Sequence, residues 1–398
     1  MRRYEKYRDS GVAWLGEIPE HWELRFLEQV CKEKCEKNLG NKENNVLSLS
    51  YGRIIRKQNI YGGLVAKDFA DYQIVKNGDI ILRFTDLQND HKSLRTGLVT
   101  ETGIITAAYV CIKPTINSAY LHYLLHAYDV RKVFYGMGAG VRQSINYKDV
   151  RHMLVPVPPL SEQNQIVKFL NYKVSRIDKL ISIRQRQIIE LEDLKKAIIS
   201  KAVTKGLNPD VPMKYSGVEW IGDIPAAWEV VCAKRYVLIT NGTNPTLEGD
   251  IPVYGSGKEP FKTCGEYKDG PTVLLGRKGT INNPTYVEGK YWNVDTAFDV
   301  KTRKNKFSIK YYYYLSTRFD YDFYMTQTAI PSMTQTDYNN MSIPVPPLHE
   351  QTQIAAYLDK KCAQIDNAVS NTQKQIVELT DLKARLISDA VTGKIDVR

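Results

Sequence analysis

The sequence predicts an α+β protein in which two small α/β domains are separated by two long helices that pair as an antiparallel coiled coil. Three observations predict this fold. Two motifs each occur twice along the chain, the segments between them read as short strands with one helix each, and a long apolar seam follows each copy of the second motif. A chain of 398 residues is also too long for one ordinary domain, so an internally repeated, pseudo-two-fold molecule is expected.

The internal repeat is carried by two motifs. SGVAWLGEIPEHWE at residues 10–23 returns as SGVEWIGDIPAAWE at residues 216–229, with nine of 14 positions identical. PVPPLSEQNQ at residues 156–165 returns as PVPPLHEQTQ at residues 344–353, with eight of ten identical. The first offset is 206 and the second is 188, so the intervening segment is 18 residues shorter in the second copy. The frame is therefore duplicated, while the segments inside it have diverged.

Those inner segments, about 24–154 and 230–342, have the pattern of small mixed domains. Short β-branched and aromatic runs lie between Gly, Asn and Pro residues, which is typical of strands. The runs are residues 79–84, 104–112 and 272–275. One helix is expected in each domain, over residues 120–128 and 311–318.

A helical period begins after each PPLxEQ motif. In the first copy the apolar positions alternate in steps of four and three, which is a heptad seam: Leu170, Val174, Ile177, Ile181, Ile188, Leu191, Ile198 and Ala202. In the second copy every position returns 188 residues later: Leu358, Cys362, Ile365, Val369, Ile376, Leu379, Leu386 and Ala390. Interruptions of the seam match too, at Arg184 with Thr372 and at Lys195 with Lys383. Each helix is expected to run for about 40 residues after its Pro-Pro, with Ser161 as the cap of the first.

Chain order predicts how the two seams pair. The first helix leads from one domain to the other, and the second helix follows the second domain. To cover the first seam, the second helix must run back, so the pair is antiparallel and ends beside the first domain. The expected segments are a domain at 1–154, a helix and linker at 155–213, a domain at 214–342 and a helix at 343–398. The alternative is that each seam pairs with a different molecule.

Composition bounds the class of protein. No run of 18 apolar residues is present, so no membrane span is expected. The six cysteines are scattered and the N-terminus lacks a secretory pattern, which together favour a reduced, cytoplasmic protein. The net charge of +11 favours a polyanionic partner. This excess lies in residues 1–214, with 34 basic against 23 acidic residues, whereas the remainder holds 21 of each.

Catalytic and metal-binding motifs are not expected in this chain. Tyr254–Glu259 departs from a phosphate loop because Pro252 replaces its first Gly and Glu259 replaces its Ser or Thr. The Asn283–Tyr286 segment (NPTY) differs from the adenine-holding motif of amino-methyltransferases, and no glycine-rich turn for S-adenosylmethionine accompanies it. The Cys31/Cys35 and His122/His126 pairs have too few ligands for a metal site, and structural roles are favoured for them.

The residues that remain are suited to binding DNA. Six stretches combine glycines and aromatics with fork-like or amide donors, at residues 51–59, 83–95, 138–147, 255–262, 276–283 and 327–338. Arginine and lysine bind guanine edges or phosphates, and Asn and Gln bind adenine. For any single residue a solvated loop is an equally good interpretation. The candidate DNA-binding residues are Arg53, Arg56, Lys57, Arg83, Arg95, Arg142, Gln143, Lys258, Arg277, Lys278, Asn282 and Gln335.

The two repeated motifs, SGVxW[LI]G[ED]IPxxW and PVPPLxEQxQI, closely resemble those of the specificity subunits of type I restriction–modification enzymes. Thr106–Tyr109 (TAAY) and Gly140–Arg142 also resemble the first-domain pattern of that family. The resemblance covers nearly the whole chain. It implies two target recognition domains, each reading one half of a split asymmetric DNA site.

The same resemblance implies the partners. The paired helices would fix the unread gap between the half-sites and dock two methyltransferase subunits. The helix residues offered for this role are Leu170, Ile177, Ile181, Leu191, Leu358, Ile365, Val369 and Leu379. S-adenosylmethionine, ATP and Mg²⁺ would then reside on partner subunits, including an ATP-dependent nuclease, and this chain would be non-catalytic. A bivalent DNA-binding scaffold that works without a methyltransferase is the alternative, and a stand-alone methyltransferase or nuclease is disfavoured by the missing motifs.

Overall fold

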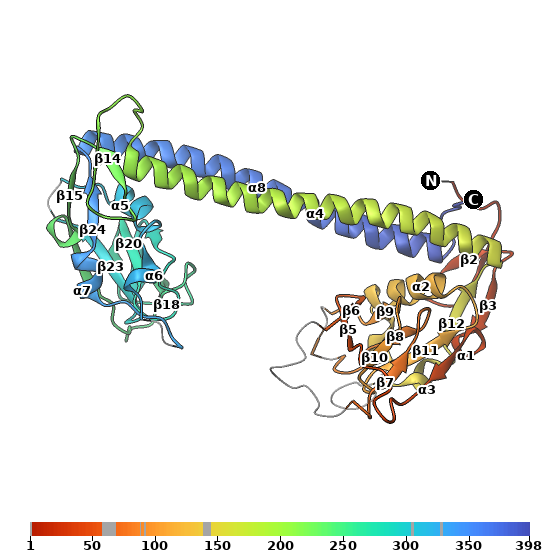
Figure 1. The fold of residues 1–398 in the computed structure, drawn as a ribbon. Coiled ribbons are helices and arrows are strands. Elements are labelled where there is room, and N and C mark those ends of the chain that lie inside the picture. The colour runs from red at the N-terminus through yellow and green to blue at the C-terminus, as the bar shows by residue number, and fades with distance from the viewer. Residues whose placement is uncertain are drawn as a thin grey trace. The chain divides into compact units, whose positions relative to one another are not determined.

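The computed structural model describes residues 2–57, 69–87, 89–90, 93–137, 145–303, 306–326 and 329–398. The chain divides into two compact units, and the division falls inside the two long helices, α4 (Leu160–Lys205) and α8 (Leu348–Val391). The first unit comprises Met1–Arg184 with Gln375–Arg398, and the second comprises Gln185–Lys374. Each unit therefore contains one mixed domain and part of both helices (Figure 1).

The first unit is built around an antiparallel four-stranded sheet with the order β4-β11-β8-β9. Two-stranded pairs β5–β6, β10–β7, β1–β2 and β12–β3 surround it. The strands are β1 (Tyr7–Asp9), β2 (Glu17–Pro19), β3 (Glu23–Phe26), β4 (Cys31–Lys34), β5 (Leu47–Ser50), β6 (Arg53–Arg56), β7 (Gln73–Val75), β8 (Ile80–Leu82), β9 (Thr96–Leu98), β10 (Gly103–Ile105), β11 (Val110–Pro114) and β12 (Leu154–Val157). Its short helices are α1 (Leu27–Val30), α2 (Ser118–Val130) and α3 (Tyr147–Val150).

The second unit repeats this plan with the sheet order β16-β23-β20-β21. It adds a second sheet, β18-β17-β22-β19, in which β17 and β22 are parallel. The strands are β13 (Met213–Tyr215), β14 (Asp223–Pro225), β15 (Glu229–Cys232), β16 (Val237–Asn241), β17 (Ile251–Tyr254), β18 (Lys262–Cys264), β19 (Lys268–Asp269), β20 (Thr272–Gly276), β21 (Thr285–Val287), β22 (Lys290–Asn293), β23 (Ala297–Thr302) and β24 (Ser342–Val345). The helices are α5 (Ile309–Ser316), α6 (Tyr321–Tyr324) and α7 (Gln335–Asn340).

The first repeated motif forms a tight turn that closes a small hairpin in each unit. In the first unit, the backbone N–H of Ser10 donates to the Gly16 carbonyl at 3.0 Å, and Ser216 donates to Gly222 at 3.0 Å in the second. Gly16 and Gly222 have φ of 65° and 68°, the left-handed region that favours glycine. The hairpins β1–β2 and β13–β14 bring the second tryptophan of each motif, Trp22 and Trp228, to full burial.

The second repeated motif locks each long helix to its domain. Glu162 accepts the indole N–H of Trp22 at 3.2 Å, and Glu350 accepts that of Trp228 at 3.0 Å. The side-chain amides of the neighbouring residues, Gln163 and Gln351, each form two hydrogen bonds to the backbone. Each accepts the backbone N–H of the residue that caps the domain helix, at 3.0 and 2.8 Å, and donates to the carbonyl of the first Pro of its own Pro-Pro, at 2.8 Å. The Trp and the Glu-Gln pair are therefore repeated because they bond to one another and to the backbone.

The two long helices run antiparallel, and they pair in the same way in both units. In the first unit, Lys383 of α8 donates to Asp178 of α4 at 2.7 Å. In the second unit, Lys195 of α4 donates to Asp366 of α8 at 2.7 Å. The two pairs are related by the 188-residue repeat: α8 supplies the lysine and α4 the aspartate in the first unit, and α4 supplies the lysine and α8 the aspartate in the second. The sequence prediction that the second helix returns along the first is confirmed, and α8 ends beside the N-terminal segment, where Asp396 N–H donates to the Arg2 carbonyl at 2.9 Å (Figure 1).

Each hydrophobic core joins one domain to both helices. Leu170 and Ile177 of α4 share the first core with Leu386 and Ala390 of α8. Leu358, Cys362 and Ala202 belong to the second core. Among the predicted seam residues, Leu170, Ile177, Leu358 and Ile365 are buried, and Ile181, Leu191, Val369 and Leu379 are half-buried.

Several local predictions need correction. Ser161 lies inside α4, because the helix already begins at Leu160, and so it is not the N-cap. The run 104–112 is not one strand, since a turn over residues 107–109 separates β10 from β11. No helix in the part of the chain that the structure describes is long and apolar enough to cross a membrane.

Candidate nucleic-acid interface

The predicted DNA-facing stretches of the first domain adjoin one another. The hairpin β5–β6 packs on the loop after β8, because a Cβ at Gly52 would lie 3.1 Å from Cδ1 of Leu94. The same loop contacts the segment before α3, where Ile145 N–H donates to the Phe84 carbonyl at 3.2 Å. Residues 58–59, 88, 91–92 and 138–144 of these stretches lie outside the described residues, and they include the candidates Arg142 and Gln143.

Arg95 differs from its prediction. The side chain is fully buried, and its guanidinium donates to the carbonyls of Arg83 at 3.2 Å and Thr85 at 2.7 Å, as well as to that of Asp90. Its Nε donates to the Tyr135 hydroxyl at 2.9 Å. A buried guanidinium needs this complete set of acceptors, so we assign Arg95 to holding the loop over residues 83–95 in place of the predicted DNA contact.

The other basic candidates that the structure describes in the first domain are exposed, apart from the half-buried Arg83, and three of them form ion pairs. Arg56 bonds the Glu101 carboxylate through Nε at 2.8 Å and also through Nη2, and Arg83 pairs with Asp90. Arg53 donates to Asp178 of α4 at 3.0 Å while its side chain stays 71% exposed. Lys57, at the end of β6, is exposed.

The three stretches of the second domain also converge, at the end of β20. The backbone N–H of Gly279 donates to the Pro331 carbonyl at 2.9 Å, and Met333 N–H donates to the Arg277 carbonyl at 3.0 Å. A Cβ at Gly279 would lie 3.5 Å from the Ser256 hydroxyl. Segments 276–283, 329–338 and 255–262 thus build one surface from residues far apart in the sequence, and residues 327–328 of the predicted stretch lie outside the described residues.

The candidate side chains on this surface differ in exposure. Lys258, Lys278 and Asn282 are exposed. Arg277 is half-buried and donates to the Asp295 carbonyl at 3.3 Å. Gln335 is half-buried as well, and its amide donates to the Ile239 carbonyl of β16, so its NH₂ group contributes to the fold.

The two surfaces occupy equivalent places in the two repeats. The loops after β8 and β20 both leave the strand that lies third in its sheet. The segments before α3 and α7 both end in a capping box, with Asn146 and Asp149 in one and Thr334 and Asp337 in the other. Asn, Asp and Thr caps satisfy the free N–H groups at a helix start. The local folds are alike, while the exposed side chains on them differ.

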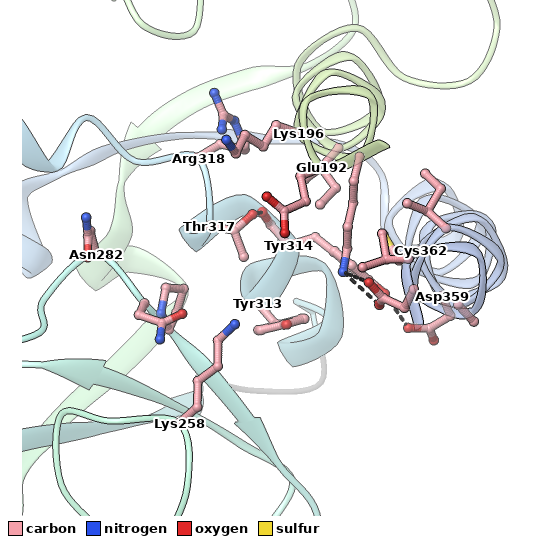
Figure 2. A pocket seen from close by; sticks show the side chains of 18 residues that line it. Glu192, Lys196, Lys258, Asn282, Tyr313, Tyr314, Thr317, Arg318, Asp359 and Cys362 are labelled. Atoms are coloured by element: carbon pink, nitrogen blue, oxygen red, sulfur yellow. Dashed lines mark hydrogen bonds and ion pairs between the residues drawn. The ribbon is translucent and has the colours of Figure 1, made fainter. Parts of the chain in front are cut away.

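A pocket lies between the domain and the helix pair in each unit. In the second unit it holds about 550 Å³ and is lined by Lys258 and Asn282 of the domain and by helix residues such as Glu192 and Asp359, with Lys258 pointing toward Tyr313 (Figure 2). The counterpart in the first unit holds about 430 Å³. In each pocket an equivalent tyrosine of the domain bonds to a long helix: Tyr314 donates to Asp359 at 2.6 Å, and Tyr123 donates to Asn171 at 2.8 Å.

The acidic members of these helix contacts, Asp178 and Asp366, were not singled out from the sequence. The signal that could have found them is the interruption of the apolar seam at Lys195 and Lys383. A lysine that recurs in a seam requires an acidic partner on the facing helix. Within the described ranges, no group of three or more His, Cys, Asp or Glu residues could hold a metal ion.

Duplicated mixed domains that share a pair of long helices, each domain with a surface formed by the predicted DNA-binding stretches, define a class of two-domain, helix-linked proteins. The family model for the type I restriction modification DNA specificity domain matches residues 19–193 and again residues 228–380. The chain therefore belongs to the type I restriction–modification DNA specificity family.

Curated relatives extend over the whole chain. A putative type I restriction enzyme MjaX specificity subunit from Methanocaldococcus jannaschii is 27% identical and aligns with 100% of this chain and 99% of its own length. The type I restriction enzyme MjaVIII specificity subunit of the same organism is 25% identical, over 96% of this chain and 94% of its own.

Solved structures share the fold. A chain from a study of complex assembly and conformational transition in the type I R-M system has a TM-score of 0.74 at 17% identity, covering 95% of this chain and 99% of that one. The HsdS subunit from Thermoanaerobacter tengcongensis has a TM-score of 0.53 at 18% identity, covering 97% and 100%.

Proposed function

We propose that this chain is the non-catalytic DNA-reading subunit of a type I restriction–modification complex, and that each domain reads one half of a bipartite asymmetric site. One observation carries the proposal: the two candidate surfaces occupy equivalent places on a duplicated frame and yet carry different side chains. Because local folds are shared, each surface meets DNA in the same manner. The exposed candidates of the first surface include Arg53 and Lys57, whereas those of the second include Lys258 and Asn282, so we expect the two half-sites to differ.

The partners follow from the same duplication. Each unit is held together by the same Trp–Glu and Tyr–helix contacts, so the surfaces of the two units around these contacts are equivalent. Two copies of one partner therefore have two equivalent places to dock. We assign these places to two methyltransferase subunits that carry S-adenosylmethionine and methylate adenine. ATP and Mg²⁺ belong to a further translocase–nuclease subunit, and the complex works on double-stranded DNA in the cytoplasm. The seam residues, Leu170 to Leu379, face the partner helix of this chain, which leaves the outer helix faces for these subunits.

The test is to map modified adenines in DNA of cells that express this chain with its methyltransferase. We expect one bipartite motif, and replacing residues 24–154 by the equivalent domain of a relative should change one half of it. A change in both halves would contradict the modular assignment. Binding of S-adenosylmethionine by the purified chain alone, or motif binding that needs no methyltransferase in the cell, would favour the other classes of function.

We further propose that the helix pair sets the number of unread base pairs. α4 and α8 are continuous over 46 and 44 residues, so an insertion in both helices is not absorbed by a loop. Four residues added beside Arg184 and Thr372 lengthen each helix by about 6 Å. B-DNA rises ~3.4 Å per base pair, so the gap should grow by one or two base pairs, with some strain in the seam. An active variant with an unchanged gap would exclude this role.

A further inference from the structure

The tip of the β5–β6 hairpin in the first domain is built to project. Tyr51 and Gly52 form its two-residue turn, with φ of 46° and 75°. Two positive φ values in succession are those of a type I′ turn, which fits the twist of a hairpin but is uncommon for tyrosine. Tyr51 is 86% exposed, whereas Gly52 lies against Leu94. The strained tyrosine is thus held outward by a turn that is packed on its other side.

The two faces of this hairpin differ in chemistry. Leu47 and Leu49 are buried in a small core, and Ile54, opposite Leu49, packs against the same core. Side chains alternate along a strand, so the other face carries Ser48, Ser50, Arg53 and Ile55. This outer face contains hydroxyl, guanidinium and apolar groups and no carboxylate. A two-stranded ribbon of this size fits the major groove of B-DNA.

The guanidinium of Arg53 is held from the side by the helix pair. Its Nη2 donates to Asp178 Oδ2 at 3.0 Å, while Asp178 Oδ1 accepts Lys383 Nζ at 2.7 Å. Asp178 and Lys383 are about three-quarters buried, at 28% and 26% exposure. Within the described ranges the other nitrogens of Arg53 have no hydrogen-bond partner. Arg53 is therefore anchored through one nitrogen and keeps donors free to bind a ligand.

The second unit has the helix pair but not the anchor. Asp366, the counterpart of Asp178, pairs with Lys195. Of the described residues in the second domain, none bonds to Asp366. Lys258 lines the same pocket, facing Tyr313, without reaching that carboxylate (Figure 2). Of the two equivalent helix carboxylates, Asp178 bonds to a residue of its domain, whereas Asp366 bonds to none of the described residues of its domain.

We propose that Arg53 reads a base edge in the half-site of the first domain, and that Asp178 is the positioning residue that orients it. The inference deepens the proposed function and rests on it. A phosphate contact tolerates a mobile side chain, because a point charge suffices. A bidentate contact to a guanine edge requires a fixed fork, and an anchor on a rigid helix supplies the orientation. The helix pair thereby takes part in reading one half-site and not the other.

The first experiment concerns Arg53. The full chain with its methyltransferase is assayed on duplexes carrying the mapped site and on duplexes with single substitutions in each half-site. Arg53→Ala should lower methylation of the mapped site by about 10- to 100-fold and remove discrimination at one or two positions of one half-site. Arg53→Lys should keep part of the rate without that discrimination. A uniform loss on all duplexes would overturn the base contact, and so would unchanged discrimination.

The second experiment uses the repeat as its own control. Asp178→Asn and Asp366→Asn both remove one cross-helix ion pair, but only Asp178→Asn releases Arg53. We expect Asp178→Asn to weaken discrimination at the same positions as Arg53→Ala, and Asp366→Asn to leave both half-sites intact. The double variant Arg53→Ala, Asp178→Asn should discriminate no worse than Arg53→Ala, because the two residues act together. Additive losses, or equal losses in the two Asp variants, would refute the positioning role.

The outcomes separate the inference from the function beneath it. If the wild-type complex methylates no bipartite motif, the proposed function fails before any variant is compared. If the motif is found and Arg53→Ala reads it as the wild type does, only the inference fails. Thermal unfolding of both Asp variants shows whether each is folded, and Asp178→Glu, which retains the carboxylate, should restore discrimination in part.

Discussion

The two units share a frame in which several polar contacts are repeated, those of Tyr120 and Tyr311 among them. In the first unit, the Tyr120 hydroxyl shares its hydrogen between the Pro156 carbonyl, at 2.9 Å, and the Val391 carbonyl in the last turn of α8, at 3.2 Å. In the second unit, the Tyr311 hydroxyl does the same with the Pro344 carbonyl, at 3.2 Å, and the Val203 carbonyl in the last turn of α4, at 3.0 Å. The domain sheets inside the frame differ, since among the described residues the additional β17–β22 sheet is found in the second unit alone. The two repeats carry identical residues where side chains join the domain to the helices, and different residues where side chains face outward.

The frames differ at one carboxylate, and the difference has a physical reason. Glu162 is buried, and its carboxylate accepts hydrogen bonds from the indole N–H of Trp22, from His21 Nε2 at 3.0 Å and from the Tyr4 hydroxyl. Glu350 accepts Trp228. In the second unit, α4 continues through a covalent link into β13. In the first unit, the end of α8 meets the N-terminal segment through hydrogen bonds and the stacking of Arg398 on Tyr4. The additional donors on Glu162, from Tyr4 and His21, bind the N-terminal segment to α4 at this junction.

The largest expected effect tests whether the frames are equivalent. Trp22→Ala and Trp228→Ala each remove a fully buried indole that packs on a helix end, since a Cβ at Gly393 or Gly206 would lie 3.2 Å from the respective ring. We expect each variant to lose about 3–5 kcal/mol of stability, confined to its own unit. Hydrogen exchange of α2 and α5 measures the two units separately. Trp22→Phe, which keeps most of the volume, is the milder control, and a loss that spreads equally over both units would contradict two separate frames.

A smaller effect should separate the frames. Glu162→Gln removes a charge that accepts three donors, whereas Glu350→Gln removes one with a single donor from the described residues. Hydrogen bonds to charged groups contribute ~1.5–3 kcal/mol, so Glu162→Gln should cost about 2–3 kcal/mol and Glu350→Gln about 1 kcal/mol. Urea unfolding monitored in each unit provides the measurement, with exposed Glu192→Gln as a control near zero. Equal costs would mean that the Tyr4 and His21 bonds add nothing to the junction.

Most of the fold follows from the sequence because its signals are periodic. The heptad seam and the repeated motifs predict two domains and an antiparallel helix pair, since a seam without a partner is unstable in water. The sheet order does not follow, because strands of three or four residues such as β8 and β9 carry too few side chains to specify which strands pair. The family model and the structural relatives confirm this fold class.

The candidate interface is predicted less well, for a reason that Arg95 illustrates. An arginine in a polar loop has the same local pattern whether it faces solvent or caps buried carbonyls. Only the three-dimensional path of the loop over residues 83–95 decides between them. Arg53 is a candidate from composition, and no local sequence pattern predicts its bond to Asp178, which joins residues 125 positions apart. Individual DNA contacts therefore stay predictions.

The smallest expected difference between the units depends on pH. Burial lowers the pKa of His122 to about 3 and that of His126 to about 4, with Lys383 adding to the shift of His126. Both histidines lie on α2, and the repeat places Tyr313 of α5 and Thr317, the C-cap of that helix, at the corresponding positions. Neither of those side chains gains a proton between pH 7.5 and pH 5.5. Acidification should therefore weaken the first unit by a route that the second unit lacks.

The sign follows from the two states of each histidine. The folded pKa lies below the unfolded value of 6.5, so the unfolded chain binds the proton first, and stability falls as the pH decreases below about 6.5. At pH 5.5 the loss should be about 1.4 kcal/mol per histidine. Hydrogen exchange of α2 and α5 at pH 7.5 and 5.5, corrected for intrinsic rates, measures the difference. In the double variant His122→Tyr, His126→Thr, which copies α5, the additional loss in α2 should disappear while His21 and His152 remain. If the loss persists in that variant, the pH sensitivity of the first unit arises outside the two buried imidazoles.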